Sequence, residues 1–139
     1  MNKLVVDSSV FVSLFGKADT FTESSASFFN NLPRDTEIIL PAIVVAETLV
    51  NLAKQKLPTK AVYDKLLKFT IVPLDGVFLE KFRQLLGDGQ MRSADLIIAA
   101  TAKLNTATLI SWDKRHLSKA NDICEALTPK QYLSQVDLN

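Results

Sequence analysis

The chain is 139 residues long, 47% of them hydrophobic and 22% charged, with a net charge of +1 at neutral pH. This length and composition predict one globular domain, residues 1–139, with its own core, and exclude a disordered or fibrous chain. The small net charge excludes a protein that holds nucleic acid through a strongly basic overall surface, so any polyanion must be held locally.

Cysteine content and the first residues narrow the class further. Cys124 is the only cysteine, which excludes an internal disulfide and a thiolate zinc cluster, and predicts a residue that fills core space. The chain begins with a strand-like segment and shows no basic region followed by a long apolar stretch. We therefore expect neither a signal peptide nor a membrane span, and a cytoplasmic location by default.

The hydrophobic pattern predicts strands and helices that alternate along the chain. In chain order, we expect a strand at 4–6, helices at 10–14 and 23–32, a strand at 37–40, helices at 42–54 and 60–68, a strand at 70–73, helices at 77–86 and 93–104, a strand at 108–111, a short helix ending at 117, a strand at 125–127 and a last helix from 129. Such alternation indicates a parallel sheet covered on both faces. The predicted fold class is α/β, with a central, mostly parallel sheet of four to five strands flanked by helices.

Local signals support several of these boundaries. Asp7-Ser8-Ser9 and Asp75 are typical helix N-caps, and Asn105 can end the helix before it in the left-handed conformation. Two glycines make 87–92 the least structured stretch of the chain.

Four acidic residues adjoin apolar segments, where an ionised carboxylate is unfavourable unless it is paired or bound to a cation. Asp7 follows Leu4-Val5-Val6, Glu47 lies within 42–49, Asp95 precedes 96–100 and Asp113 follows 109–112. In a parallel sheet, ligands bind at the carboxyl ends of the strands, where the strand order reverses. Two of the acids follow strand ends and two lie on helices that can face the same edge. We therefore expect all four to converge on one crevice.

Four converging carboxylates would raise one another's pKa values unless a cation neutralised them. Oxygen ligands without a nearby histidine or cysteine select Mg²⁺ or Mn²⁺ over zinc or copper, and Mg²⁺ characteristically bridges to a substrate phosphate. This predicts phosphodiester hydrolysis by a metal-activated water. The predicted catalytic metal ligands are Asp7, Glu47, Asp95 and Asp113.

Each acid also has a purely structural interpretation. Asp7 can be a helix N-cap, Asp95 a favourable charge in a first helical turn, and Asp113 a turn residue. Glu47 shares its helix face with Ile43, which places it at the boundary of the buried side, where a single arginine could pair with it. The case for a metal site therefore rests on the four acids together.

The order and setting of these acids resemble the PIN-domain family. The matching segments are Val6-Asp7-Ser8-Ser9, Ala46-Glu47, Ser93 to Ala102 and Ile110-Ser111-Trp112-Asp113. Their size and spacing look most like the VapC-type toxins of prokaryotic toxin–antitoxin modules. The resemblance implies a PIN-like three-layer fold and a Mg²⁺- or Mn²⁺-dependent endoribonuclease. It also implies a homodimer that is inhibited by a cognate antitoxin, whose extended segment occupies the active-site groove.

Carried over position by position, the four acids match the metal-binding quartet of that family. Ser9 matches the small polar residue that often supports the quartet. Ser111 stands where many members have threonine and keeps a hydroxyl near the site. Trp112 is bulkier than the residue common at its position, and this difference could alter access of the substrate.

Residues beside the acids are candidates for contacts with RNA. Arg92, Lys114 and Arg115 are predicted to contact phosphate by virtue of their position. Trp112 is more typical of a core residue than of a base-stacking one, and His116 of a surface histidine than of a general base.

Alternative functions stay open at this point. A housekeeping PIN nuclease in RNA processing and a catalytically silent PIN-like interaction module would both have this fold. A receiver domain would use Asp75 as phosphoacceptor, and a haloacid-dehalogenase phosphatase would need an aspartate where Ser9 stands. For a homodimer, the apolar residues expected to supply an interface are Phe28, Phe29, Leu49 and Leu67.

Overall fold

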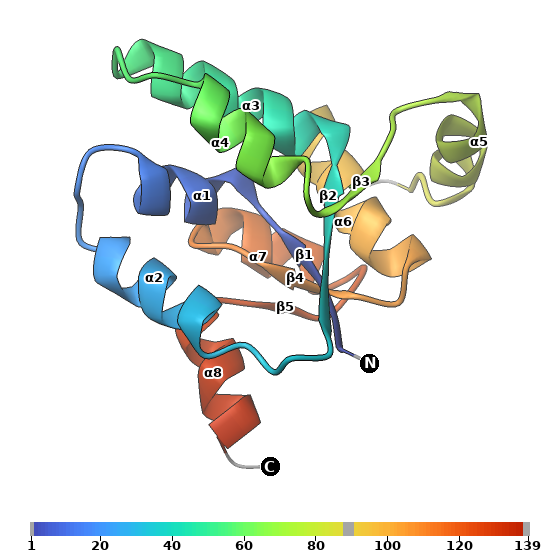
Figure 1. Ribbon diagram of the computed structural model, residues 1–139. Helices are drawn as coiled ribbons and strands as arrows, with labels where there is room; N and C mark the ends of the chain where they lie inside the picture. The colour runs from blue at the N-terminus through green and yellow to red at the C-terminus, as the bar shows by residue number, and fades with distance from the viewer. Residues whose placement is uncertain (1, 88–90, 138–139) are drawn as a thin grey trace.

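The computed structural model describes residues 2–87 and 91–137 (Figure 1). Its elements, in chain order, are β1 (Asn2–Val6), α1 (Ser8–Phe15), α2 (Thr22–Asn30), β2 (Thr36–Pro41), α3 (Ala42–Lys54), α4 (Lys60–Leu66), β3 (Thr70–Val72), α5 (Gly76–Gln84), α6 (Ser93–Leu104), β4 (Thr108–Ile110), α7 (Lys114–Ala120), β5 (Ala126–Leu127) and α8 (Pro129–Asp137). Every predicted strand and helix is present. The predicted irregular stretch at 87–92 lies partly outside the described residues.

The strands form one sheet in the order β3-β2-β1-β4-β5, and every pairing is parallel. Val5 of β1 pairs with Ile39 of β2 on one side and with Leu109 of β4 on the other. The chain therefore builds outward from β1 in one direction, then returns to add β4 and β5 on the other side. The strand order reverses between β1 and β4, and the carboxyl ends of these two strands face the crevice that such a reversal creates.

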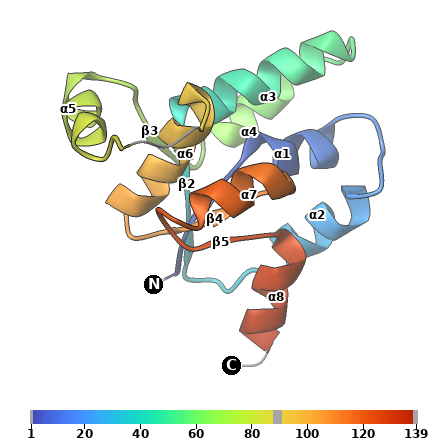
Figure 2. The ribbon, with the colours of Figure 1, turned by 180° about the vertical axis from the view of Figure 1, so that it is seen from behind.

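Helices cover both faces of the sheet, as predicted. The first four helices, α1 to α4, lie over one face, and α6 and α7 lie over the other (Figures 1 and 2). This division follows from right-handed crossovers. The connections from β1 to β2 and from β2 to β3 run in one direction along the sheet, and those from β3 to β4 and from β4 to β5 run in the other, so their helices lie on opposite faces. Helix α8 packs against α2 and β5, whereas α5 extends away from the sheet beside α6.

The core lies between the sheet and these helices. Its largest fully buried side chains are Phe11, Phe28, Leu4, Ile39, Leu40, Leu52, Leu66, Ile98, Leu109, Ile110, Val5 and Val6. Burial of each large apolar side chain contributes about 1.5–3 kcal/mol to stability. Cys124 packs against this core, and burial raises the pKa of its thiol to about 11, as expected of a space-filling cysteine.

The end of α6 differs from the prediction. Asn105 has a φ of −101°, whereas Thr106 has a φ of 51° and so takes the left-handed conformation. The backbone N–H of Ala107 donates to the carbonyl of Ala102, and that of Thr106 to the carbonyl of Lys103, which together form a Schellman motif. Asn105 instead uses its side-chain amide to donate to a carbonyl of the last turn of α6. The helix ends at Leu104 as predicted, and the left-handed residue that reverses the chain is Thr106, one residue later than expected.

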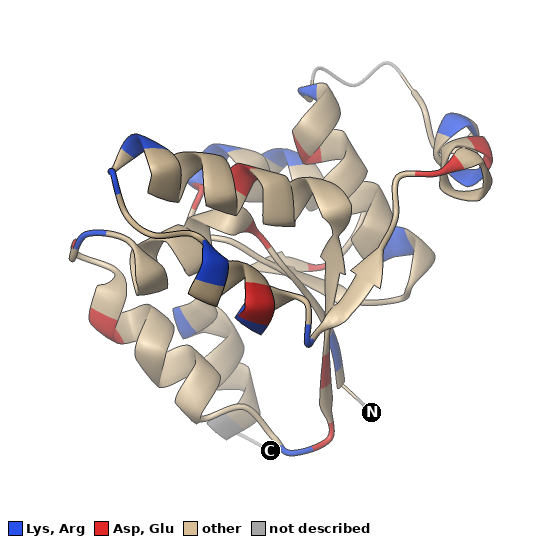
Figure 3. Cartoon of the chain, turned by 45° about the horizontal axis from the view of Figure 1, so that its top comes forward, with Lys and Arg blue, Asp and Glu red and all other residues tan. Residues whose placement is uncertain are grey.

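Charges of both signs are distributed over the same elements, as Figure 3 shows for α5. This agrees with the small net charge and with the prediction that nucleic acid is not held by a uniformly basic surface. Within residues 2–87 and 91–137, no helix has the length and apolar character needed to cross a membrane.

Candidate functional site

Asp7 lies at the end of β1 with only 6% of its surface exposed. It occupies the N-cap position of α1, but its carboxylate makes no capping hydrogen bond. One carboxylate oxygen, Oδ2, instead accepts hydrogen bonds from the hydroxyls of Ser9 (3.0 Å) and Ser111 (2.8 Å). In the described part of the chain, no side chain donates to the other oxygen, Oδ1. The capping prediction is therefore correct for the position of Asp7 and wrong for its side chain.

The two serine hydroxyls connect Asp7 to the backbone that follows β4. Ser9 Oγ accepts a hydrogen bond from the backbone N–H of Trp112, and Ser111 Oγ accepts one from that of Asp113, both at 3.0 Å. A hydroxyl can accept one hydrogen bond while it donates its single proton elsewhere, here to Asp7. Two consecutive backbone N–H groups are thus linked through the serines to one carboxylate oxygen, which holds the Asp7 side chain in a single orientation.

Glu47 lies in the second turn of α3 and is half-buried. The hydroxyl of Ser8 donates to its Oε1 at 3.4 Å. Burial raises the pKa of Glu47, and the negative charges of Asp7 and Asp95 raise it further, while Ser8 and His116 act in the opposite direction. Glu47 is therefore close enough to both Asp7 and Asp95 to be repelled by their charges, as the sequence predicts for a shared crevice.

Asp95 lies in the first turn of α6, with 31% of its side chain exposed, and contacts His116 of α7. His116 Nε2 lies 3.0 Å from the backbone carbonyl of Asp95, and since a carbonyl oxygen only accepts, Nε2 carries the proton. His116 Nδ1 lies 3.9 Å from the Asp95 carboxylate. The prediction of a surface histidine is wrong, because α7 packs against α6 and leaves His116 only 2% exposed.

Asp113 is exposed and caps α7. Its Oδ1 accepts hydrogen bonds from the backbone N–H groups of Arg115 (3.0 Å) and His116 (3.1 Å). The expectation that all four acids are embedded in apolar surroundings is therefore wrong for Asp113. The chain leaves the sheet at Ile110, so Asp113 begins a surface helix despite the apolar residues before it.

A hollow of the surface places Asp113 beside Asp95 and beside basic side chains. Its lining residues are Arg92, Asp95, Asp113, Arg115, His116 and Lys119. Two of the three predicted phosphate contacts, Arg92 and Arg115, thus share a hollow with two of the acids. Lys114 lines a separate depression on the other side of α7, with Leu117 and Thr128. Lys119 was not singled out from the sequence, because only the turn of α7 brings it to the acids.

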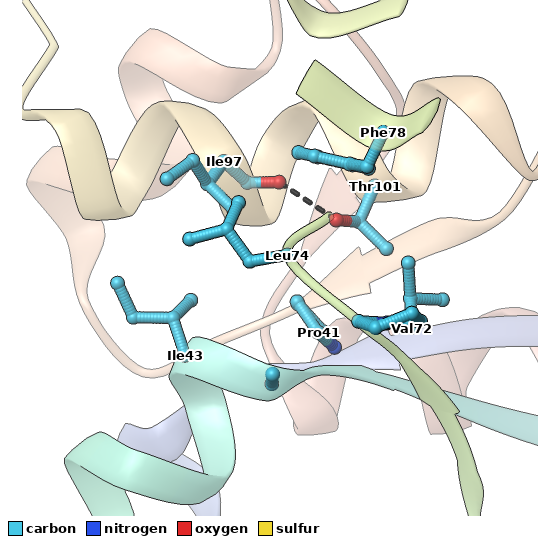
Figure 4. A pocket seen from close by; sticks show the side chains of 9 residues that line it. Pro41, Ile43, Val72, Leu74, Phe78, Ile97 and Thr101 are labelled. Atoms are coloured by element: carbon cyan, nitrogen blue, oxygen red, sulfur yellow. Dashed lines mark hydrogen bonds between the residues drawn. The ribbon is translucent and has the colours of Figure 1, made fainter. Parts of the chain in front are cut away.

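A small pocket is lined by residues of both α3 and α6 (Figure 4). Ile43 lies one turn before Glu47 on α3, and Ile97 lies two residues after Asp95 on α6. Both side chains line this pocket together with Leu74 from the segment after β3. Side chains close in sequence to Glu47 and Asp95 thus line one pocket between α3 and α6. The side chains that line this pocket are apolar except for Thr101, and none of the acids is among them.

The donor chemistry of the acids fits a hard divalent cation, since carboxylate oxygens are the ligands that Mg²⁺ and Mn²⁺ prefer. Across the described ranges, no group of three or more His, Cys, Asp or Glu side chains is close enough to coordinate one ion directly. Mg²⁺ keeps several waters and is commonly held through one or two carboxylates, so it does not require three side chains in direct contact. A cation would satisfy two features of the site: Asp7 Oδ1, to which no side chain of the described residues donates, and the repulsion of Glu47 by neighbouring charges.

Trp112 is partly buried between β4 and α7, in partial agreement with the core prediction. Its ring stacks on Phe21 at a centroid distance of 4.4 Å, and its Nε1 donates to Ser25 Oγ at 2.8 Å. Neither partner was singled out from the sequence. No local signal could have found them, because Trp112 and Ser25 are 87 residues apart along the chain.

The structure resembles solved toxin–antitoxin proteins at low sequence identity. It superposes on FitAB bound to a DNA fragment with a TM-score of 0.71 and 21% identity, over 91% of this chain and 94% of that one. A toxin–antitoxin complex from Klebsiella pneumoniae gives a TM-score of 0.69 and 21% identity, over 91% and 97% of the two chains. VapC20 of Mycobacterium tuberculosis, a toxin that cleaves the sarcin–ricin loop, gives 0.67 and 15%, over 83% and 93%. At such identities the similarity establishes the fold.

Comparison with sequences gives the family. No curated protein sequence matches the chain significantly. The family model of the PIN domain matches residues 4–122, which include all four acids and every strand before β5 in full or in large part. The chain belongs to the PIN-domain family.

Proposed function

We propose that this protein is a divalent-metal-dependent endoribonuclease that hydrolyses RNA phosphodiester bonds and acts as the toxin of a toxin–antitoxin pair. The observation that carries the proposal is the convergence of Asp7, Glu47 and Asp95 at the reversal of strand order, close enough that the pKa of Glu47 rises. Membership of the PIN family supports the same chemistry, because PIN nucleases generally use divalent metals. The proposed ions are Mg²⁺ or Mn²⁺.

Asp7, Glu47, Asp95 and Asp113 are the proposed catalytic residues that hold the metal. When bound there, the ion supplies an activated water and stabilises charge on the phosphate. Asp7 offers its Oδ1, because Ser9 and Ser111 engage only Oδ2. Asp113 offers its Oδ2, because its capping hydrogen bonds reach Oδ1. The hydrogen bonds from the two serines support the site by limiting the orientations of Asp7.

Basic residues in the hollow beside the acids are the proposed contacts for RNA phosphates. Arg92 and Arg115 line this hollow with Asp95 and Asp113. A guanidinium can pair with two phosphate oxygens at once, which positions the backbone of the RNA next to the metal ligands. Lys119 shares the hollow, whereas Lys114 faces another depression and is the weakest of the proposed contacts.

The proposed partners are a cognate antitoxin and a second copy of this chain, all in the cytoplasm. The fold similarity to FitAB and to the Klebsiella pneumoniae complex supports the antitoxin. For a dimer, the interface expected from the sequence needs correction, since Phe28 is completely buried in the core. Leu67 is 44% exposed and Val50, on the neighbouring helix α3, is 52% exposed, so the surface of α3 and α4 offers apolar contacts.

The direct test is cleavage of a long single-stranded RNA by the purified protein with Mg²⁺, with Mn²⁺ or with EDTA. We expect cleavage with either metal and none with EDTA. Asp95→Asn should abolish cleavage and leave the circular dichroism spectrum unchanged, whereas the control Asp64→Asn, an exposed acid on α4, should cleave at the wild-type rate. Equal cleavage by Asp95→Asn and wild type would contradict the assignment.

A second experiment separates the toxin from a housekeeping nuclease or a silent interaction module. Mn²⁺ titration by calorimetry should show binding and thermal stabilisation, which a silent module would lack. Co-expression with the short protein of an adjacent reading frame should yield a stable complex in which RNA cleavage is inhibited. An active nuclease with no such partner would indicate a housekeeping role.

A further inference from the structure

Trp112 takes part in two hydrogen-bond networks, one through its backbone N–H and one through its indole N–H. Its backbone N–H donates to Ser9 Oγ, which in turn donates to Asp7. Its indole N–H donates to Ser25 Oγ in the first turn of α2. The residue before the proposed ligand Asp113 is thus tied both to the acidic site and to a helix on one face of the sheet.

The network on the indole side has a single consistent direction. Ser13 Oγ donates its proton to the carbonyl of Val10 at 2.8 Å. The hydrogen bond between Ser13 and Ser25 must therefore use the proton of Ser25, which leaves Ser25 Oγ to accept from Trp112. Ser13 and Ser25 are 2% and 0% exposed, so bulk water does not contact the Ser25 hydroxyl while the indole is in place. The geometry consequently requires a hydrogen-bond donor at the position of the indole nitrogen.

The ring of Trp112 is held on a second side by Phe21. The two rings are nearly parallel, with an interplanar angle of 16°. Thr22, the first residue of α2, donates to the carbonyl of Ser13 and keeps the start of α2 against α1. The indole therefore has both a fixed hydrogen-bond acceptor and a fixed stacking surface, each supplied by the region from residue 21 to residue 25.

We propose that Trp112 is a positioning residue of the metal site, and that its indole N–H, anchored on Ser25, fixes the backbone that orients Asp7. The N–H groups of Trp112 and Asp113 are consecutive, so a rotation of the backbone at residue 112 would move both donors that hold Ser9 and Ser111. Trp112 acts through these serines and has no assigned contact with substrate. The proposal rests on the proposed function in that it takes Asp7 as a metal ligand.

Outer-shell partners of metal ligands are typically worth about 10–100-fold in metal affinity or activity. Trp112→Phe keeps an aromatic ring for Phe21 and removes the indole N–H together with part of the ring surface. Ser25→Ala removes the acceptor of the same hydrogen bond from the other side. If the anchor matters, the two variants should share one phenotype, although they lie on different elements.

The experiment measures Mn²⁺ affinity by calorimetry on the full-length wild type, Trp112→Phe, Ser25→Ala and a control, Tyr132→Leu. Tyr132 is buried on α8, where its ring contacts Phe28 of α2, so the control loses core packing without removing a member of the hydrogen-bond network. We expect both test variants to bind Mn²⁺ at least about tenfold more weakly. The control should lower the melting temperature and leave Mn²⁺ affinity unchanged. On RNA, both test variants should lower kcat with KM unchanged.

The inference would be overturned by wild-type Mn²⁺ affinity in both folded test variants, or by an equal loss of affinity in Tyr132→Leu. Absence of Mn²⁺ binding by the wild type would overturn it as well. The proposed function is tested by a separate measurement, RNA cleavage. If the wild type binds Mn²⁺ but cleaves no RNA, the proposed nuclease activity is refuted. The positioning role of Trp112 can still be tested in that case, because it is measured by Mn²⁺ affinity.

Discussion

The ends of β1 and β4 present the same local pattern, an aspartate at the N-cap of the helix that follows, and use it differently. Asp7 is buried and directs its carboxylate to two serine hydroxyls, whereas Asp113 is exposed and caps α7. The difference arises because α1 begins directly after β1, while two residues separate β4 from Asp113. The same residue type in the same position is therefore fixed by tertiary contacts in one case and by its own helix in the other.

Among variants that compare the ends of β1 and β4, Asp7→Asn should have the largest effect. An asparagine can still accept from Ser9 and Ser111 through its amide oxygen, so the fold should persist, and loss of the negative charge relieves repulsion with Glu47. We expect RNA cleavage to fall at least about a hundredfold, because a direct ligand should exceed the 10–100-fold typical of outer-shell partners. The melting temperature should stay the same or rise. A variant that cleaves normally would remove Asp7 from the site.

Asp113 allows its two roles to be separated by two substitutions. Asparagine caps a helix as well as aspartate does, whereas alanine at the same position lowers stability by about 1 kcal/mol. Asp113→Asn should therefore keep the wild-type stability and still lose about tenfold or more of the cleavage rate through the lost ligand charge. Chemical denaturation and cleavage rates measure the two effects. Full activity in Asp113→Asn would show that Asp113 is a cap alone.

Ser111→Ala tests whether the hydroxyl network orients Asp7. The substitution leaves the backbone N–H of Asp113 and one acceptor site of Asp7 without their partner. We expect Mn²⁺ affinity to fall about tenfold and stability to fall by about 1–3 kcal/mol. Ser134→Ala, which removes an exposed hydroxyl of α8, serves as the matched control. Unchanged Mn²⁺ affinity would show that Asp7 needs no support from Ser111.

The smallest expected effect is the pH dependence of the melting temperature of Glu47→Gln. Because burial and the charges of Asp7 and Asp95 raise the pKa of Glu47, ionised Glu47 destabilises the metal-free fold. The penalty is absent below the ordinary pKa of 4.5 and grows as pH rises through the folded-state pKa. Glu47→Gln should therefore raise the melting temperature in EDTA by about 1–2 °C at pH 7.5 and have no effect at pH 4.

The control for this pH effect is Glu23→Gln, which neutralises an exposed acid on α2. We expect no comparable gain at either pH. In Mn²⁺ the gain from Glu47→Gln should disappear, because a bound cation offsets the repulsion. A gain that persists in saturating Mn²⁺ would argue against Glu47 as a ligand.

Much of the fold could be predicted because its signals are local. The runs of buried residues in β1, β2 and β4 and the apolar faces of α3 and α6 are visible in the sequence. The convergence of Glu47 with Asp7 and Asp95 was also predictable, since parallel strands bring their carboxyl ends to one edge. The burial of each residue was less predictable, and both Asp113 and His116 were misplaced on this point.

The sequence by itself determined the alternation of strands and helices, the parallel sheet and the set of acids at its edge, because these depend on periodicity and chain direction. Only the tertiary structure decided which of the acids cap helices, that His116 is enclosed and that Trp112 is anchored on Ser25. The physical reason is that hydrogen bonds between side chains depend on which distant elements pack together. Asp7 and Ser111 are 104 residues apart along the chain, and the pairing of β1 with β4 brings them within 2.8 Å.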